Sequence, residues 1–270
     1  FFLSSQILGH TAGSHLSDFL LTLFEVLHPL LCLQVKIPMS ALPSSLVKFS
    51  LSKCNRVGVI TLSSPDTLNA LTFEMGLQFR DLVESLNLAL TVPSPEVDTN
   101  VGSPFSDSNG SIITPYPLPP STSSISSVVI TGEGRCFSAG GSMPFLKSRG
   151  ETPPHINSEI MYRFYKSYLC IRTLPVPVMA AINGPAVGAG ACLTLACDYR
   201  VMSPKAFLSF NFLRLGIHPG MGGTHFLPTT VGYSTSKSIM LSSSRLPPPY
   251  CLTSGLVDHV HGQVGDGEGR

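Results

Sequence analysis

The sequence predicts an α/β fold built around a largely parallel sheet. Apolar runs of strand length at residues 126–131 and 175–182 are each followed by a glycine-rich turn and a helical segment. Alternation of buried strands with helices is typical of a parallel sheet that has helices packed on its faces. The chain has 270 residues, 43% of them hydrophobic, which is enough for one sizeable core.

We divide the chain into three parts. Residues 45–260 carry the fold signals and form the predicted domain. Residues 1–44 are an unassigned N-terminal extension, and residues 261–270 are an expected unstructured tail. An apolar run at residues 19–33 is too short for a bilayer and is interrupted by Glu25, His28 and Pro29, so we expect no membrane span.

The first half of the domain is expected to contain two strands, a helix and an insertion. Residues 47–62 form two strands around a turn at 53–55, and residues 72–90 form an amphipathic helix with Thr72 as its N-cap. Residues 91–127 are dense in Ser, Pro, Thr and Gly. Because such a composition buries little apolar surface, we expect a disordered insertion at 91–127.

The second half continues the strand–helix alternation. After the strand at 126–131 we expect a helix at 158–173, the strand at 175–182 and a helix of small residues that ends near residue 197. A short strand at 200–202 and a helix at 227–241 follow, and the three prolines at 247–249 end that helix.

Composition argues against a nucleic-acid partner and against a metal site. The net charge is +1, only 12% of the residues are charged, and no basic stripe is visible. The 7 cysteines form no Cys-x-x-Cys pair, and no histidine lies at zinc-finger spacing from them. Reduced thiols in an intracellular protein are the ordinary interpretation of such a pattern.

Two segments share the plan of buried strand, glycine-rich turn and helix, at residues 128–143 and 177–198. Backbone N–H groups exposed at such turns carry partial positive charge and can hold an anion. Two turns that face one point would form a two-donor oxyanion hole. For either turn alone, close packing of a strand against a helix is the more ordinary explanation.

These segments resemble the crotonase (enoyl-CoA hydratase/isomerase) family. The matching stretches are GRCFSAGGSM at 134–143, INGPAVGAG at 182–190 and RLGIHPGMGGTHFLP at 214–228, together with Asn69-Ala-Leu and Asp198-Tyr-Arg. The resemblance covers residues 45–260 outside the insertion. It implies a ββα superhelix, here with the C-terminal helical part truncated, and a location in the mitochondrion or the peroxisome.

The resemblance also implies a ligand and its contacts. The ligand is an acyl-CoA thioester, with coenzyme A as part of the substrate and no separate cofactor. The backbone N–H groups of Gly141 and Ala189 correspond to the two oxyanion donors. Further residues correspond to the acyl-CoA path, namely Ala70, Leu71, Ala139, Gly140 and Ser142, and Ser142 also suits an N-cap. Family members form homotrimers or hexamers.

The sequence departs from the hydratases of this family at both catalytic glutamates, whose positions correspond to Cys192 and Phe212. Hydration needs a group that activates water and a proton source for the α-carbon. Phe212 can serve as neither, and a thiol with an ordinary pKa of about 8.5 is a poor substitute. His218 is the alternative proton shuttle, unless His218 and His225 serve only packing.

Three interpretations remain open at this point. The chain is an acyl-CoA-processing enzyme of the hydratase/isomerase type that stabilises a thioester enolate, or a non-catalytic acyl-CoA-binding or scaffold subunit. The third interpretation is a truncated gene product without a stable fold.

Overall fold

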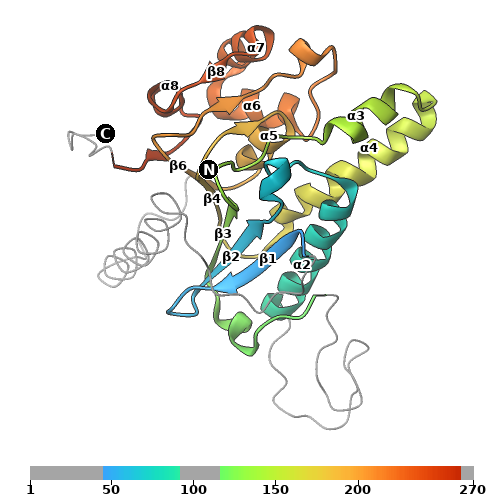
Figure 1. Cartoon of the computed structure of the whole chain (residues 1–270). Helices are drawn as coiled ribbons and strands as arrows, with labels where there is room; N and C mark the ends of the chain where they lie inside the picture. The colour runs from blue at the N-terminus through green and yellow to red at the C-terminus, as the bar shows by residue number, and fades with distance from the viewer. Residues whose placement is uncertain (1–44, 92–115, 263–270) are drawn as a thin grey trace, which may run out of the picture.

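The computed structural model describes residues 45–91 and 116–262, and the extension at 1–44, most of the insertion and the end of the tail lie outside these residues. One sheet forms the centre of the molecule (Figure 1), with the strand order β1-β2-β3-β4-β6-β9. The strands are β1 (Val47–Leu51), β2 (Val57–Leu62), β3 (Ser127–Gly132), β4 (Val178–Ile182), β6 (Tyr199–Met202) and β9 (His259–Val260).

The pairing of the strands confirms the expected α/β class. β1 runs antiparallel to β2, whereas the other neighbours in the sheet are parallel. All residues of β2, β3 and β4 are buried, because elements cover both faces of these strands. A smaller sheet in the order β5-β7-β8 consists of β5 (Ala186–Val187), β7 (Leu208–Ser209) and β8 (Arg245–Leu246).

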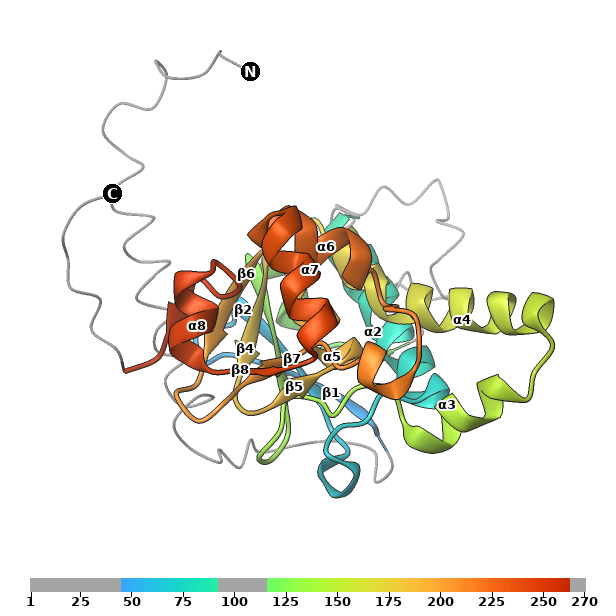
Figure 2. The same cartoon turned by 90° about the horizontal axis from the view of Figure 1, so that it is seen from above.

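The helices surround the two sheets. They are α2 (Phe73–Thr91), α3 (Met143–Gly150), α4 (Pro154–Leu169), α5 (Ala189–Leu195), α6 (Gly223–Val231), α7 (Tyr233–Ser242) and α8 (Pro248–Thr253). The described residues also form four short 3₁₀ segments, η1 (Pro65–Thr67), η2 (Pro120–Ser124), η3 (Cys170–Thr173) and η4 (Leu213–Leu215). Both views show α3 and α4 extending away from the main sheet (Figure 1 and Figure 2).

The helix predicted at 72–90 is confirmed as α2. Its capping residue is also confirmed, because the Thr72 hydroxyl accepts a hydrogen bond from the Met75 N–H at 3.1 Å. Phe79 lies on the buried face of α2, and its ring centroid is 5.6 Å from that of Tyr168 on α4. The Tyr168 hydroxyl donates to the Thr72 carbonyl at 2.6 Å, so α4 is tied to the start of α2.

The second half of the chain holds more helix than predicted. α3 was not predicted, and α4 begins at Pro154 instead of 158. Pro144 and Pro154 stand in the first turns of these helices, where a missing N–H has no consequence. The helix expected at 227–241 is in fact α6 and α7, which meet at Gly232 with φ of 79°.

The prediction of a disordered insertion over all of 91–127 is wrong at both ends. Thr91 is the last residue of α2, and residues 120–124 form η2. The Tyr116 N–H donates to the Ser85 hydroxyl at 2.9 Å, and Thr122 is buried. Composition misses this order because packing against α2 stabilises a segment that has little helical or strand preference of its own.

No helix in the described ranges is long and apolar enough to cross a bilayer.

Candidate functional site

Asn69 holds the first glycine-rich turn in place. Its side chain is fully buried, and its Nδ2 donates to the carbonyls of Glu133 at 2.9 Å and Cys136 at 2.8 Å. Its Oδ1 accepts from the Ser64 N–H at 2.8 Å. A buried amide with three such partners fixes the loop between β3 and α3 against the segment that precedes α2.

The backbone of this turn leaves the Gly141 N–H without a protein acceptor. Leu71 donates to the Gly140 carbonyl at 2.7 Å and accepts from the Ser142 N–H at 3.0 Å, which makes a parallel bridge between Leu71 and Gly141. In a bridge of this type the intervening residue directs its own N–H to the opposite side. None of the hydrogen bonds between described residues uses the Gly141 N–H.

The second glycine-rich turn presents the Ala189 N–H in the same way. Gly188 has φ of 52° and ψ of −119°, a conformation that residues with a Cβ rarely adopt, and α5 starts at the next residue. Ala189 is therefore the first helical residue, whose N–H has no acceptor inside the helix. Among the described residues we find no acceptor for it elsewhere.

The two turns are in close contact. A Cβ atom built on Gly140 would lie 2.6 Å from the Val187 carbonyl oxygen and 3.5 Å from the Ala189 nitrogen. A Cβ on Gly190 would lie 2.7 Å from the Cβ of Ser138, whose hydroxyl donates to the Asn69 carbonyl at 2.8 Å. Glycines at these positions let the two backbones approach, which brings the two unpartnered amides to the same region.

Both amides border one cavity of about 1210 Å³. Most residues predicted as acyl-CoA contacts or catalytic groups line it, namely Ala70, Ala139, Gly140, Gly141, Ser142, Ala189 and His218. Leu71 is the exception, because its side chain is fully buried in the core next to the cavity wall. Ser142 does precede α3, but its side chain makes no capping hydrogen bond, so that part of the prediction is wrong.

None of the described residues that line the cavity is Asp or Glu, and among them the side chains that could exchange a proton are those of His218 and Tyr165. Phe212 lines the cavity, whereas Cys192 does not. The Cys192 thiol is enclosed between α5 and α6, 2.9 Å from the position of a Cβ on Gly223, and burial raises its pKa well above the ordinary range.

The two histidines have different surroundings. His218 is exposed and lines the cavity, and no hydrogen bond between described residues involves its ring. His225 does not line the cavity, and its ring packs edge-on against Phe226 with centroids 5.3 Å apart. Within the described residues no group of three or more His, Cys, Asp or Glu could hold a metal ion.

The cavity residues that were not predicted from the sequence include Arg149, Asn157 and Tyr165. The Tyr165 hydroxyl lies against Gly220, and burial, together with the neighbouring Cys192, raises the pKa of Tyr165. Tyr165 is therefore protonated at neutral pH and can donate a hydrogen bond. The spacing of Asn157, Met161 and Tyr165 on one face of α4 is a sequence signal that could have indicated Asn157 and Tyr165, whereas Arg149 lies on α3.

Comparison with known proteins was consistent across sequence and structure. The family model described as "Enoyl-CoA hydratase/isomerase" matches residues 121–265. The chain is 30% identical to the Mycobacterium tuberculosis protein named "Probable enoyl-CoA hydratase echA14" over 71% of this chain and 60% of the relative. It is 34% identical to the Mycosarcoma maydis "Enoyl-CoA isomerase/hydratase fer4" over 49% of this chain and 48% of that protein.

The fold agrees with solved structures. An enoyl-CoA hydratase from Mycobacterium avium subsp. paratuberculosis superimposes with a TM-score of 0.60 and 28% identity, covering 82% of this chain and 73% of that chain. The expected crotonase-type fold is confirmed by this match. The chain spans about 60% of the length of the Mycobacterium tuberculosis relative. A family match over more than half of the chain, two glycine-rich turns in contact and a shared fold lead to one conclusion: the chain belongs to the enoyl-CoA hydratase/isomerase family.

Proposed function

We propose that this protein binds an acyl-CoA thioester and stabilises the enolate that forms when a proton leaves the α-carbon, or when water adds to the β-carbon of a conjugated thioester. The observation that carries the proposal is the pair of amides from Gly141 and Ala189, which border one cavity and have no acceptor among the described residues. The relatives are named as hydratases or isomerases, and both reactions pass through a negatively charged thioester oxygen.

The chemistry of the two amides suits that charge. As the enolate forms by either route, negative charge moves onto the carbonyl oxygen, and two N–H groups fixed by the backbone can stabilise it without reorganising. Asn69 and the bridge to Leu71 hold one amide, and the first turn of α5 holds the other. Losing one such donor typically lowers the rate by about 10²- to 10³-fold.

None of the described residues that line the cavity carries a carboxylate that could move the proton. His218 is our candidate for the proton shuttle, because an imidazole can both accept and donate a proton and this one lines the cavity. Tyr165, neutral and within the same cavity, would donate a hydrogen bond to substrate or water. In this assignment, changing His218 to alanine lowers turnover and leaves the binding of an acyl-CoA nearly unchanged.

A second candidate is a non-catalytic acyl-CoA-binding subunit. The observation in its favour is the chemistry of the two positions where hydratases of this family carry glutamates. Phe212 lines the cavity without any titratable group, and Cys192 is buried behind the wall. In this case the protein would bind CoA thioesters and turn over none of them.

Ala189→Pro is the sharpest test of the amide pair. Proline removes the Ala189 N–H, and the first position of a helix tolerates proline, so α5 should persist. We expect turnover of a conjugated enoyl-CoA, followed by its thioester absorbance, to fall by about 10²-fold or more. Ala189→Ser keeps the N–H and is the matched control, which should retain turnover.

The outcomes separate the candidates. Loss of turnover in the proline variant alone supports the enolate proposal, and equal activity of both variants contradicts it. Calorimetric binding of CoA thioesters without turnover in the unaltered protein favours the binding subunit. No binding at all contradicts both. A homotrimeric or hexameric assembly and a mitochondrial or peroxisomal location stay predictions.

A further inference from the structure

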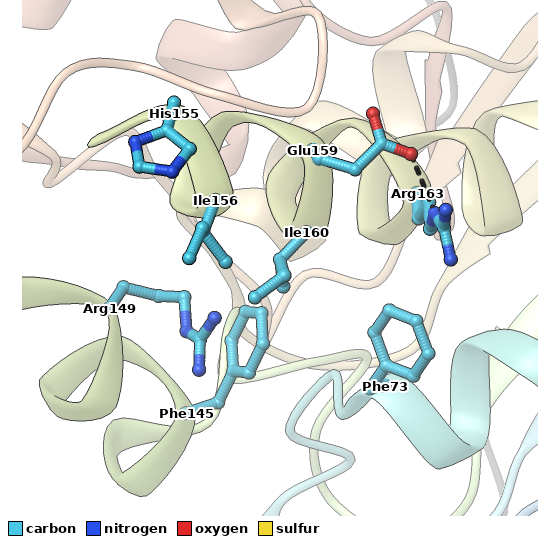
Figure 3. Close-up of a pocket in the computed structure, with 8 residues that line it drawn as sticks. All are labelled: Phe73, Phe145, Arg149, His155, Ile156, Glu159, Ile160 and Arg163. Carbon is cyan, nitrogen blue, oxygen red and sulfur yellow. Dashed lines mark hydrogen bonds and ion pairs between the residues drawn. The ribbon is translucent and has the colours of Figure 1, made fainter. Parts of the chain in front are cut away.

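Arg149 lies between the large cavity and a second, smaller pocket. Asn157, Met161 and Tyr165 on one face of α4 line the large cavity, and Ile156, Ile160 and Arg163 on the other face line a second pocket of about 670 Å³. Arg149 borders both. Figure 3 shows the Arg149 guanidinium beside the Phe145 ring. The central carbon of the guanidinium lies 5.1 Å from the ring centroid.

The positive charge of Arg149 has no counter-ion among the described residues. Its one hydrogen bond there runs from Nη2 to the Ser148 hydroxyl at 3.2 Å, while Nε and Nη1 are shielded from solvent and have no acceptor. Glu159 already has an ion-pair partner, because its Oε1 accepts a hydrogen bond from the Arg163 Nε at 2.7 Å, as the dashed line in Figure 3 marks. Shielded donors without partners are unfavourable, so an acceptor that enters the cavity here would be held firmly.

Asn157 adds a second unpartnered group to this part of the cavity. Its Oδ1 is shielded from solvent and makes no hydrogen bond with the described residues. Rotation of the amide by half a turn exchanges its oxygen and nitrogen, so Asn157 can offer either an acceptor or a donor to a ligand.

The position of Arg149 relative to the amides sets the size of the ligand. Arg149 lies in the last turn of α3, six residues after Met143, which corresponds to about 9 Å along the helix axis. Apolar side chains line the stretch between, with Leu146 packed 3.5 Å from the Cβ position of Gly141. The cavity thus has two amide donors at one point, then an apolar section, and then the positively charged side chain of Arg149 in the last turn of α3.

We infer that this end of the cavity binds a carboxylate at the far end of the acyl group. The substrate class is then the CoA monothioesters of dicarboxylic acids, with the thioester at the amides of Gly141 and Ala189 and the free carboxylate at Arg149. Guanidinium groups are well suited to carboxylates, and such charge-assisted hydrogen bonds are stronger than neutral ones. The inference rests on the proposed binding of acyl-CoA thioesters.

The test compares two ligands that differ only in the terminal carboxylate, hexanoyl-CoA and adipoyl-CoA, with free CoA as the reference. By calorimetry we expect the unaltered protein to bind adipoyl-CoA about 10-fold more tightly than hexanoyl-CoA. Arg149→Gln should bring this ratio close to one. Lys147→Gln, which removes an exposed charge from the same helix outside the cavity lining, should keep the ratio.

Each outcome has a distinct meaning. A ratio near one in the unaltered protein overturns the inference while acyl-CoA binding stands, and so does a ratio that survives Arg149→Gln. If Arg149→Gln weakens free CoA as much as adipoyl-CoA, Arg149 contacts the phosphates of CoA, and the carboxylate assignment is wrong. If neither thioester binds, the proposed function itself fails.

Discussion

Single side chains determine where the two amides point. Asn69 joins three backbone groups from two loops, and Ser138 links that asparagine to the Gly140 N–H, which donates to the Ser138 hydroxyl at 3.2 Å. These bonds are buried or partly buried, so a lost partner leaves a polar group with little access to water. The arrangement of Gly140 and Gly141 therefore depends on a few polar residues that are not among those lining the cavity.

Asn69→Ala should destabilise the fold. It leaves the Ser64 N–H and the carbonyls of Glu133 and Cys136 without their side-chain partner, at about 1 kcal/mol each, so we expect a loss of about 3 kcal/mol. Urea unfolding measures it. The control is Asn87→Ala, which removes an exposed bond to the Thr173 hydroxyl and should change the free energy of unfolding by under ~1 kcal/mol. A similar effect of both substitutions would contradict the role of Asn69.

The thiols should react in the order set by their surroundings. Burial opposes ionisation of Cys54, but its hydrogen bond to Ser52 and backbone bonds outweigh this and lower its pKa, whereas burial raises the pKa of Cys136 to about 11. The thiolate is the reactive form. Among the described thiols, Cys54 should therefore be alkylated first as the pH rises, and Cys192 should be alkylated only after unfolding. Mass spectrometry of the folded protein checks this, and early labelling of Cys192 would show that α5 opens.

At the scale of elements, the contact of α5 with the first glycine-rich turn is what brings the site together. α5 consists entirely of buried small or apolar residues and one threonine, and Gly190 faces Ser138 with no room for a methyl group. Small side chains are needed here because α5 packs directly against the backbone of the first glycine-rich turn.

Gly190→Ala should push α5 and that turn apart. The added Cβ would lie 2.7 Å from the Ser138 Cβ and 2.9 Å from the Ser138 carbonyl oxygen, and backbone cannot yield as a flexible side chain does. We expect a loss of about 1–3 kcal/mol in the free energy of unfolding and weaker acyl-CoA binding. Gly150→Ala at the end of α3 meets nothing within 4 Å and serves as the control for the free energy of unfolding. Unchanged stability and binding in Gly190→Ala would mean that the contact is not needed.

At the scale of the whole molecule, the elements differ strongly in how far they are buried. β2, β3 and β4 are buried throughout, while α3 has no buried residue and extends with α4 away from the sheet (Figure 2). The cavity lies between this pair of helices and the body, so one of its walls belongs to the less buried part.

Hydrogen exchange should therefore differ strongly between these parts. Amides of the three central strands should exchange only through global unfolding, whereas those of α3 should exchange through local opening. Adding an acyl-CoA should slow exchange in α3 and leave the strands unchanged, since the ligand would contact Leu146 and Arg149. Mass spectrometry of peptides with and without ligand measures this. Equal protection of α3 and β3 without ligand would contradict it.

The local sequence by itself determined the strands at residues 47–62 and 175–182, the helix that follows Thr72 and the two glycine-rich turns. Hydrophobic period, capping residues and glycine act within a few neighbours, so they can be read along the chain. The family resemblance then indicated Gly141 and Ala189. The local sequence did not predict α3 or the ordered segment around Thr122, because packing against distant residues stabilises them.

Only the tertiary structure decided which groups share the cavity. It brings Tyr165, Asn157 and Arg149 to the cavity that Gly141 borders, encloses Cys192 behind the wall, and leaves Arg149 without a counter-ion among the described residues. Partners far apart along the chain, such as Asn69 and Cys136, meet through sheet order and helix packing. The physical reason is that burial and unmet hydrogen bonds belong to the surroundings of a residue in space, and a linear pattern does not contain those surroundings.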